Sequence, residues 1–392
     1  MRAWSLVATV AVVCASCVSA AAAENPGPRH PVGPDVPLPG PEKTHFERRV
    51  TVEGLTADAI QSACDRAAAS EVKVVFLPAG EYLFEKTVDV PAGVTLLGEG
   101  SRTHCHGKDW ERTVFQVSGS DVRITRLRLE GPSTTRDVRN NSTGVNVNGR
   151  ESVRVDHCEI FGFCRAVNFS GGSGQLDHSS VHDCPRDGLG YGICIVAGAR
   201  VLVADNRFAQ CRHALASNGA LDWSSPKRLG RYVHKGDVRK THWEFVHNHV
   251  DTNDRTQYEL CAVDTHPGMD GTFVIEYNVF ENLRHGVGIH DGSGLIRGNL
   301  FRNLRGKPFR PFLAIYVSWG KHNDIEVEGT MPRNIEITGN RFELDGPARP
   351  YQIGKAENVT IDGKLVEETR TDPTRPTPPI TRLEPVGAEY AR

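Results

Sequence analysis

Short stretches in which apolar and polar residues alternate recur along most of the chain. Seven of them, among them VRVDHCEIFGF, VLVADNRFAQC and FVIEYNVFENL, share one layout: an alternating stretch, a small polar or amide residue, and a further apolar residue. A period of two is typical of a β-strand with one buried face. The chain is therefore expected to repeat one structural unit rather than to join independent elements.

Alignment of the seven stretches places one small residue of each at a shared position. These residues are Cys158, Ser179, Asn206, Asn248, Asn278, Asn299 and Asn340. A short coil cannot bury its apolar face alone, so coils must stack. Asparagines at one recurring turn can then form a ladder in which each amide bonds the next coil's backbone. The pattern predicts an all-β protein, a right-handed single-stranded parallel β-helix. An antiparallel sandwich is the alternative, and it would require hairpin turns.

A helix is expected before the repeats, in TADAIQSACDRAAAS. Thr56 is a plausible N-cap, and Ile60, Ala63 and Ala67 have helical spacing. A solenoid exposes its apolar interior at each end, so this helix is expected to cover the open N-terminal end.

The two ends of the chain differ from the repeats. Arg2, a short apolar run and small residues near Ala20 give residues 1–23 the pattern of a secretory signal peptide. The run is too short to span a bilayer. We therefore expect a secreted or periplasmic protein, without a lipoprotein anchor at Cys17. The expected organisation is a signal peptide (1–23), a Pro-rich linker (24–45), the β-helix domain (46–368) and a Pro-rich tail (369–392).

Charge and cysteine content limit the classes of binding partner and the covalent links to be expected. The formal net charge of −2 on 392 residues argues against a nucleic-acid binder, which is normally strongly basic. Export would permit disulfides, but most of the 10 cysteines stand in apolar patterns and are interpreted as small buried side chains. Cys184 and Cys211 are the one pair worth testing for a disulfide. We expect a monomer.

The stretch CAVDTHPGMDG, residues 261–271, carries the candidate chemistry. Asp264 and His266 are two residues apart, so a strand presents both on one face. RHALASN, RHGVGIH and LAIYVS align with it and predict three stacked columns. The columns are Asn218, His266, His290 and Ser318; Ala216, Asp264, Gly288 and Tyr316; and His213, Cys261 and His285. Asp264, His266 and His290 are thus the candidate catalytic residues.

The longest irregular insertion, residues 217–240, follows one of these strands. It is rich in Lys and Arg, which favour an acidic ligand, and its aromatics could stack on sugars; an ordinary solvated loop is the alternative. The candidate substrate-binding residues are Arg212, His213, Asn218, Trp223, Lys235, His285, Asp291 and Tyr316.

Two resemblances to known families support this reading. VFLPAGEY and VPAGVTLLGEG resemble the opening of the pectate-lyase-like superfamily, which implies the β-helix fold. DTHP with the following RHGVGI resembles mannuronan C5-epimerases around residues 258–290. Asp264 and His266 match that family's carboxylate and imidazole, which implies that the histidine takes part in proton transfer at C5 of a uronate. Cys261 and Asp291 stand where that family has a tyrosine and an arginine.

Four functions remain open from the sequence. The first is a lyase or C5-epimerase that acts on a polysaccharide through a His base, and we expect that polysaccharide to be acidic. The second is a glycoside hydrolase with a pair from Asp264, Asp270 and Asp291. The third is a divalent-metal site of His213, His266, His290 and Asp264. The lyase or epimerase hypothesis itself requires no cofactor. The fourth is a non-catalytic glycan-binding or surface β-helix protein.

Overall fold

The computed structural model describes most of the chain. The described residues are 26–37, 40–107, 112–135, 141–219, 231–232, 239–251, 261–305, 312–319, 326–327, 331–366 and 380–386. The expected signal peptide lies outside them. Among the described residues, no helix is long and apolar enough to cross a membrane.

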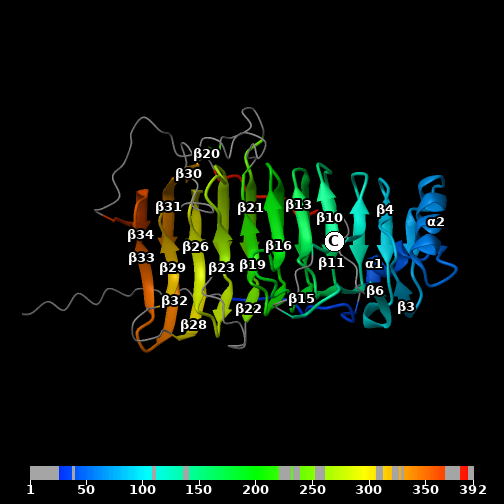
Figure 1. The fold of residues 1–392 in the computed structure, drawn as a ribbon, viewed down its shortest axis with the longest axis horizontal. Helices are drawn as coiled ribbons and strands as arrows, with labels where there is room; N and C mark the ends of the chain where they lie inside the picture. Colours follow the sequence, from blue (N-terminus) through cyan, green and yellow to red (C-terminus); the bar gives the residue numbers. More distant parts are fainter. Residues whose placement is uncertain are drawn as a thin grey trace, which may run out of the picture.

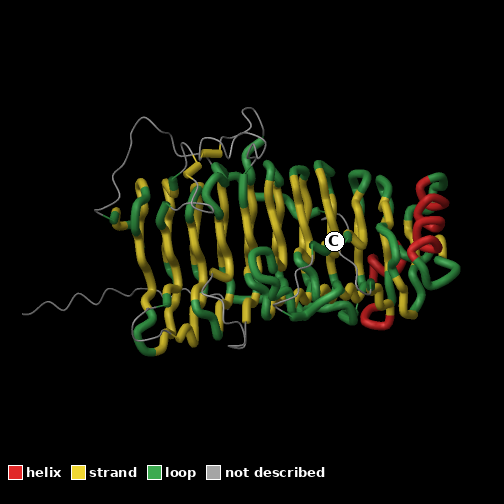
Figure 2. Tube along the Cα trace, viewed as in Figure 1, coloured by secondary structure: helices red, strands yellow, loops and turns green. Residues whose placement is uncertain are grey.

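Successive strands form three long sheets, which lie along the molecule's length as a right-handed parallel β-helix (Figures 1 and 2). Sheet A contains β1 (Val50–Thr51), β2 (Val74–Phe76), β5 (Thr95–Leu97), β8 (Arg123–Thr125), β11 (Val153–Asp156), β14 (Ser173–Asp177), β17 (Arg200–Ala204), β21 (His242–Val246), β24 (Thr272–Glu276), β27 (Gly292–Arg297), β31 (Pro332–Thr338), β34 (Glu357–Ile361) and β35 (Lys364–Leu365).

Sheet B contains β3 (Gly80–Leu83), β6 (Thr103–His106), β9 (Arg128–Glu130), β12 (Glu159–Phe161), β15 (Ser180–His182), β18 (Arg207–Ala209), β22 (His249–Asp251), β25 (Val279–Glu281), β28 (Leu300–Arg305) and β32 (Arg341–Asp345). Sheet C contains β4 (Val88–Val90), β7 (Thr113–Val117), β10 (Thr143–Asn148), β13 (Arg165–Ser170), β16 (Tyr191–Val196), β19 (His213–Ser217), β23 (Cys261–Thr265), β26 (His285–Ile289), β29 (Leu313–Val317) and β33 (Arg349–Ile353). A small separate sheet pairs β20 (Arg231–Tyr232) with β30 (Glu326–Val327).

The parallel pairing decides between the two expected architectures. Each coil adds one strand to each sheet in turn, so β13, β14 and β15 are followed by β16, β17 and β18 in the same sheets. Among the described strands only β34 and β35 pair antiparallel. The antiparallel sandwich is therefore wrong, and the β-helix is confirmed.

An asparagine ladder joins the coils at the turn between sheets A and B, as the aligned stretches predicted. The side-chain oxygen of Asn278 accepts from both the backbone N–H and the side-chain amide of Asn248, at 2.8 and 3.2 Å. Its own amide donates to Phe245 O at 2.8 Å and to Asn299 Oδ1 at 2.9 Å. Ser179 holds the equivalent position earlier in the chain, where its hydroxyl accepts from Cys158 N. Every polar atom of the buried Asn278 side chain is thus satisfied.

The helix expected at the open end is α2 (Ala57–Ala68), and the side chain of Thr56 caps it by accepting from Ala59 N at 3.3 Å. Ile60, Ala63 and Ala67 are fully buried and join the main apolar core. Figure 1 shows α2 across one end of the stack. Two shorter helices, α1 (Gly40–His45) and the 3-10 turn η1 (Gly100–Arg102), lie near the same end.

Parallel pairing brings distant residues into the predicted columns. Val263 pairs with Leu215 on one side and with Val287 on the other, and all three are buried in the core. The next column contains Ala216, Asp264, Gly288 and Tyr316. Because side chains alternate across a strand, this second column belongs to the outer face of sheet C.

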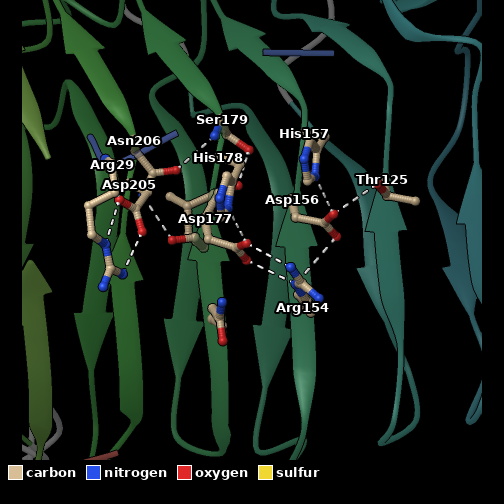
Figure 3. A network of polar contacts seen from close by, with 12 residues as sticks. Arg29, Thr125, Arg154, Asp156, His157, Asp177, His178, Ser179, Asp205 and Asn206 are labelled. Atoms are coloured by element: carbon tan, nitrogen blue, oxygen red, sulfur yellow. Dashed lines mark hydrogen bonds and ion pairs between the residues drawn. The ribbon is translucent and has the colours of Figure 1, made fainter. Parts of the chain in front are cut away.

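Part of the segment expected to be a linker packs against the β-helix. Residues 26–37 run along the turns between sheets A and B, where Gly27 N donates to Tyr277 O and Gly33 N to His178 O. Arg29 forms an ion pair with the buried Asp205 at 2.8 Å. Figure 3 shows this pair beside a row in which His178 bonds Asp177. A Pro-rich segment cannot form a hydrophobic core of its own. Its polar groups can still form hydrogen bonds and ion pairs with buried groups of the β-helix.

The described part of the expected tail docks in the same way. Arg382 pairs with Glu244, at 2.9 Å, and with Glu276. Both glutamates are buried on sheet A, and an unpaired buried carboxylate is costly. Val386 N donates to Gln175 Oε1 at 2.9 Å. Residues 380–386 are therefore part of the folded body.

The described cysteines behave as the sequence indicated. All eight are free, and all are buried except Cys261, which is partly exposed. Cys184 and Cys211, the pair chosen for testing, contact each other as thiols rather than as a disulfide.

The ladder predicts a specific cost for Asn278→Ala. The substitution leaves the backbone N–H of Asn248 and the carbonyl of Phe245 without their side-chain partners in a buried site, so unfolding should become easier by about 2–4 kcal/mol. Asn278→Ser is the matched control, because Ser179 fills this position elsewhere, and it should cost less. Denaturant unfolding measures both. A loss below about 0.5 kcal/mol for the alanine variant would contradict a stabilising ladder.

Candidate active site on sheet C

Asp264 lies at the centre of three histidines on the outer face of sheet C. Its Oδ2 is 3.3 Å from His266 Nε2 and 3.8 Å from His213 Nε2, and its Oδ1 is 3.5 Å from His290 Nε2. Three different coils supply these groups through β19, β23 and β26. The columns predicted from the sequence therefore converge on one carboxylate.

Backbone carbonyls fix how two of the imidazoles face Asp264. Nδ1 of His213 bonds the carbonyl of Cys261, and Nδ1 of His290 bonds the carbonyl of Ser318 at 3.0 Å. A carbonyl can only accept, so Nδ1 carries the proton in both rings. In the neutral form each Nε2 then has a lone pair, and both lone pairs point at the carboxylate.

Burial governs the charges in this cluster. The side chain of Asp264 is 10% exposed and that of His213 is fully buried. Burial opposes ionisation of Asp264, but attraction to the charged forms of His266 and His290, together with a hydrogen bond from His266, holds its pKa below the usual range. Burial lowers the pKa of His213 to about 3, against the attraction of Asp264. His213 is therefore a neutral imidazole beside a carboxylate anion.

Tyr191 is a site residue that the sequence reasoning missed. Its ring centroid lies 5.6 Å from that of His213 and 6.4 Å from that of His266. Arg212 Nη1 is 3.5 Å from the Tyr191 hydroxyl. Burial raises the pKa of Tyr191 to about 12, so its hydroxyl keeps its proton. Extending the strand alignment by one coil could have identified it, because Tyr191 is the first residue of β16 and pairs with His213 in β19.

The other candidate residues fall into two groups. Tyr316 is half-buried with its ring 5.6 Å from that of His290, and Arg212 lies near Tyr191, so both border the cluster. His285, by contrast, accepts from Leu313 N at 3.1 Å, and the Asn218 side chain accepts from Gly219 N at 2.7 Å. Trp223 and Lys235 lie outside the described residues.

Two of the three aspartates considered for hydrolysis have other partners. Asp291 is 1% exposed, and its oxygens accept from the backbone N–H groups of Gly268, Asp270, Gly292 and Met331. Asp270 forms ion pairs with Lys240 and, at 3.2 Å, with Arg333. We therefore place Asp291 in the scaffold of the turn after β26 rather than in the site. Within the described chain, Asp264 alone of the three contacts the histidines.

Long connections adjoin, in the sequence, the strands that carry and border the cluster. Residues 218–241 follow β19, residues 252–260 precede β23, and residues 318–331 follow β29. Of the first and last, the structure describes β20 and β30, which pair with each other. Insertions on one face of a solenoid commonly build its binding surface.

A separate cavity of about 930 Å³ lies on the outer face of sheet A, between α1 and the docked residues 383–386. Arg123 and Arg154 line it, but Arg123 is paired with Glu42 and Asp156, and Arg154 with Asp177 at 2.8 Å. It contains no counterpart of the Asp264 cluster, so we interpret it as a groove beside the docked C-terminal segment.

Comparison with known proteins agrees with the fold. A model of the right-handed β-helix region matches residues 116–326, more than half of the chain. The chain belongs to this right-handed β-helix family. A search of curated proteins found no match.

Several solved structures share this β-helix. Alginate lyase from Paenibacillus sp. str. FPU-7 is 15% identical with a TM-score of 0.53, over 79% of this chain and 99% of that one. ORF18 of Geobacillus virus E2 is 14% identical with a TM-score of 0.52, over 83% and 64%. The catalytic unit of a GH87 α-1,3-glucanase from Streptomyces thermodiastaticus strain HF3-3 is 18% identical with a TM-score of 0.51, over 85% and 58%. At these identities the likeness concerns the fold of this family.

The space beside Asp264 depends on Gly288, which allows a test of the packing. A Cβ at position 288 would lie 2.5 Å from Cys261 Sγ and 3.4 Å from Asp264 Oδ1. Gly288→Ala should therefore destabilise the protein by about 1–3 kcal/mol through overpacking.

The same substitution in a Cys261→Ala background is the control, because it removes the sulfur that the methyl group would meet. Its cost should then fall, giving a measurable coupling between the two positions in denaturant unfolding. Additive costs would show that the sulfur does not occupy this space.

Proposed function

We propose that this protein is a secreted, carbohydrate-active enzyme that abstracts a proton from an acidic polysaccharide, as a lyase or a C5-epimerase does. The observation that carries the proposal is the buried Asp264 carboxylate between His266 and His290 on an outer face. These side chains lie outside the apolar core, so packing of the core does not account for their presence. The fold it shares with a structure named as an alginate lyase, nearly all of which is covered, supports a polysaccharide substrate.

The residues supply the parts of such a reaction. In a uronate, the hydrogen at C5 lies next to the carboxylate, and an imidazole can act as base near neutral pH. His266 and His290 are the candidates for this base, with Asp264 orienting them. The electron pair of the broken C5–H bond moves into the sugar carboxylate to form an enolate, which needs a nearby cation.

Two outcomes follow from the same enolate. If its electrons return to form a C4–C5 double bond, the C4–O bond breaks and the leaving oxygen needs a proton. Tyr191 is a candidate donor, since its hydroxyl stays protonated near neutral pH; it donates to Gly188 O at 3.1 Å in this structure and would have to turn toward the leaving oxygen. If instead a proton returns to the opposite face of C5, the product is the epimer and no bond to oxygen breaks.

A substrate panel tests the proposal. The purified protein is incubated with acidic and neutral polysaccharides. A new ultraviolet absorbance from an unsaturated uronate identifies a lyase, and deuterium uptake at C5 without chain cleavage identifies an epimerase. We expect one of these with an acidic polysaccharide, and a loss of at least about 100-fold in His290→Ala or His266→Ala.

The control is His249→Gln on sheet B, which removes an imidazole outside the site and should leave activity unchanged. New reducing ends without the absorbance would instead identify a hydrolase. Binding of a polysaccharide without turnover would favour a glycan-binding protein. Either result, or wild-type turnover in both histidine variants, would overturn the proposal.

A further inference from the structure

Two buried acceptor atoms in the cluster have no hydrogen-bond partner among the described residues. They are Nε2 of His213 and Oδ1 of Asp264. Buried polar atoms are nearly always satisfied, so an exception requires an explanation. A water molecule could donate to these atoms. A cation is the other kind of group that a nitrogen lone pair and a carboxylate can both bind.

The orientation of the rings indicates what else could occupy this space. Nδ1 of His213 is committed to the carbonyl of Cys261, which leaves its Nε2 lone pair directed at Asp264. An imidazole that donates one N–H to a carbonyl and offers its other nitrogen is the usual arrangement of a metal ligand. His290 has the same arrangement through Ser318 O.

The distances also suit a metal. One nitrogen each from His213 and His266 and one oxygen from Asp264 lie within 4.8 Å of one another. This oxygen is Oδ2 of Asp264, which belongs to the same carboxylate as the unpartnered Oδ1, and it is 3.8 and 3.3 Å from the two nitrogens. Two ligands bound tetrahedrally at about 2.1 Å from one ion lie about 3.4 Å apart, so small side-chain shifts complete the set.

We propose that His213, Asp264 and His266 bind one divalent first-row transition metal ion. Two imidazoles and one carboxylate suit Zn²⁺ or a neighbouring metal rather than Ca²⁺ or Mg²⁺, which prefer oxygen ligands. Three protein ligands leave at least one coordination position for an outside group. Gly288 presents no side chain on the column between Asp264 and Tyr316, and the sulfur of Cys261 occupies the space that its Cβ would take.

This inference concerns binding, and its consequence for catalysis rests on the proposed function. The enolate formed at C5 requires a cation, and Asp291 stands where the resembling epimerases have an arginine. A metal held by these three residues would supply the missing positive charge to the sugar carboxylate. His266 would then be a metal ligand and could not also take the proton, so the base in the metal-bound protein would be His290, which lies outside this ligand set.

A second group with metal-ligating atoms provides a contrast. His249, Asp251 and Glu281 also lie within ligand distance of one another on sheet B. Here, however, His249 Nε2 is 2.7 Å from Glu281, and Glu281 forms a further ion pair with Arg302. A cation already neutralises this carboxylate, so we expect no metal there.

Metal binding is measured directly, without substrate. The protein, free of any polyhistidine tag, is stripped with a chelator and titrated with Zn²⁺ by calorimetry, and its metal content is measured after dialysis. Co²⁺ serves as a second probe, because its visible absorption reports the ligand geometry. We expect one equivalent of Zn²⁺, with affinity at least about 100-fold weaker in Asp264→Asn and His213→Gln.

His249→Gln is the matched control and should retain the full equivalent, while circular dichroism checks that every variant is folded. Failure of the wild-type protein to bind Zn²⁺ or Co²⁺, or full binding in folded Asp264→Asn, would overturn the inference. The proposed function is tested separately. Activity in the metal-free protein would refute the metal's role and leave the lyase or epimerase standing, whereas metal binding without turnover on any polysaccharide would do the reverse.

Discussion

Parallel pairing between successive coils is the constraint on which the rest of this structure depends. It places a residue of each coil directly beside its counterpart in the next, so residues about 25 to 50 positions apart become neighbours at the spacing of adjacent strands. The asparagine ladder, which runs from Asn206 to Asn340, holds one edge of these coils in register. A slip of one residue would turn Asp264 into the core and Val263 outward.

Within this scaffold, the burial of the Asp264 carboxylate is unfavourable, and core packing does not explain it. A buried carboxylate costs free energy unless charges or hydrogen bonds compensate for it, and here imidazoles rather than arginines surround it. Other buried acids have structural partners: Asp177 receives an arginine, Arg154, and Asp291 receives four backbone N–H groups. This difference in partner separates a structural carboxylate from one available for chemistry or for a metal.

The repeat made much of this architecture predictable from the sequence. One alignment of four short stretches was enough to place Asp264 with His266, His290 and Tyr316, because register in a β-helix follows directly from that alignment. The capping helix was predictable from Thr56 and its spacing.

Other features depended on tertiary contacts that no local pattern contains. Tyr191 belongs to an earlier coil that was not included in the alignment. The bonding of Asp291 to four backbone N–H groups depends on a turn that the sequence does not describe. The docked terminal segments are Pro-rich, and their attachment comes from single arginines, Arg29 and Arg382, that reach buried acids. Composition alone therefore assigned them to a linker and a tail.

The most direct test of the account is a crystal structure of His290→Ala with an acidic oligosaccharide bound. We predict that a uronate lies on the outer face of sheet C, with its C5 within about 4 Å of the space that the His290 imidazole occupies in the wild-type protein. Its carboxylate should point toward the metal position proposed between His213, Asp264 and His266, because the Asp264 anion alone would repel it. An oligosaccharide bound instead in the sheet A cavity beside Arg123 and Arg154 would contradict the account.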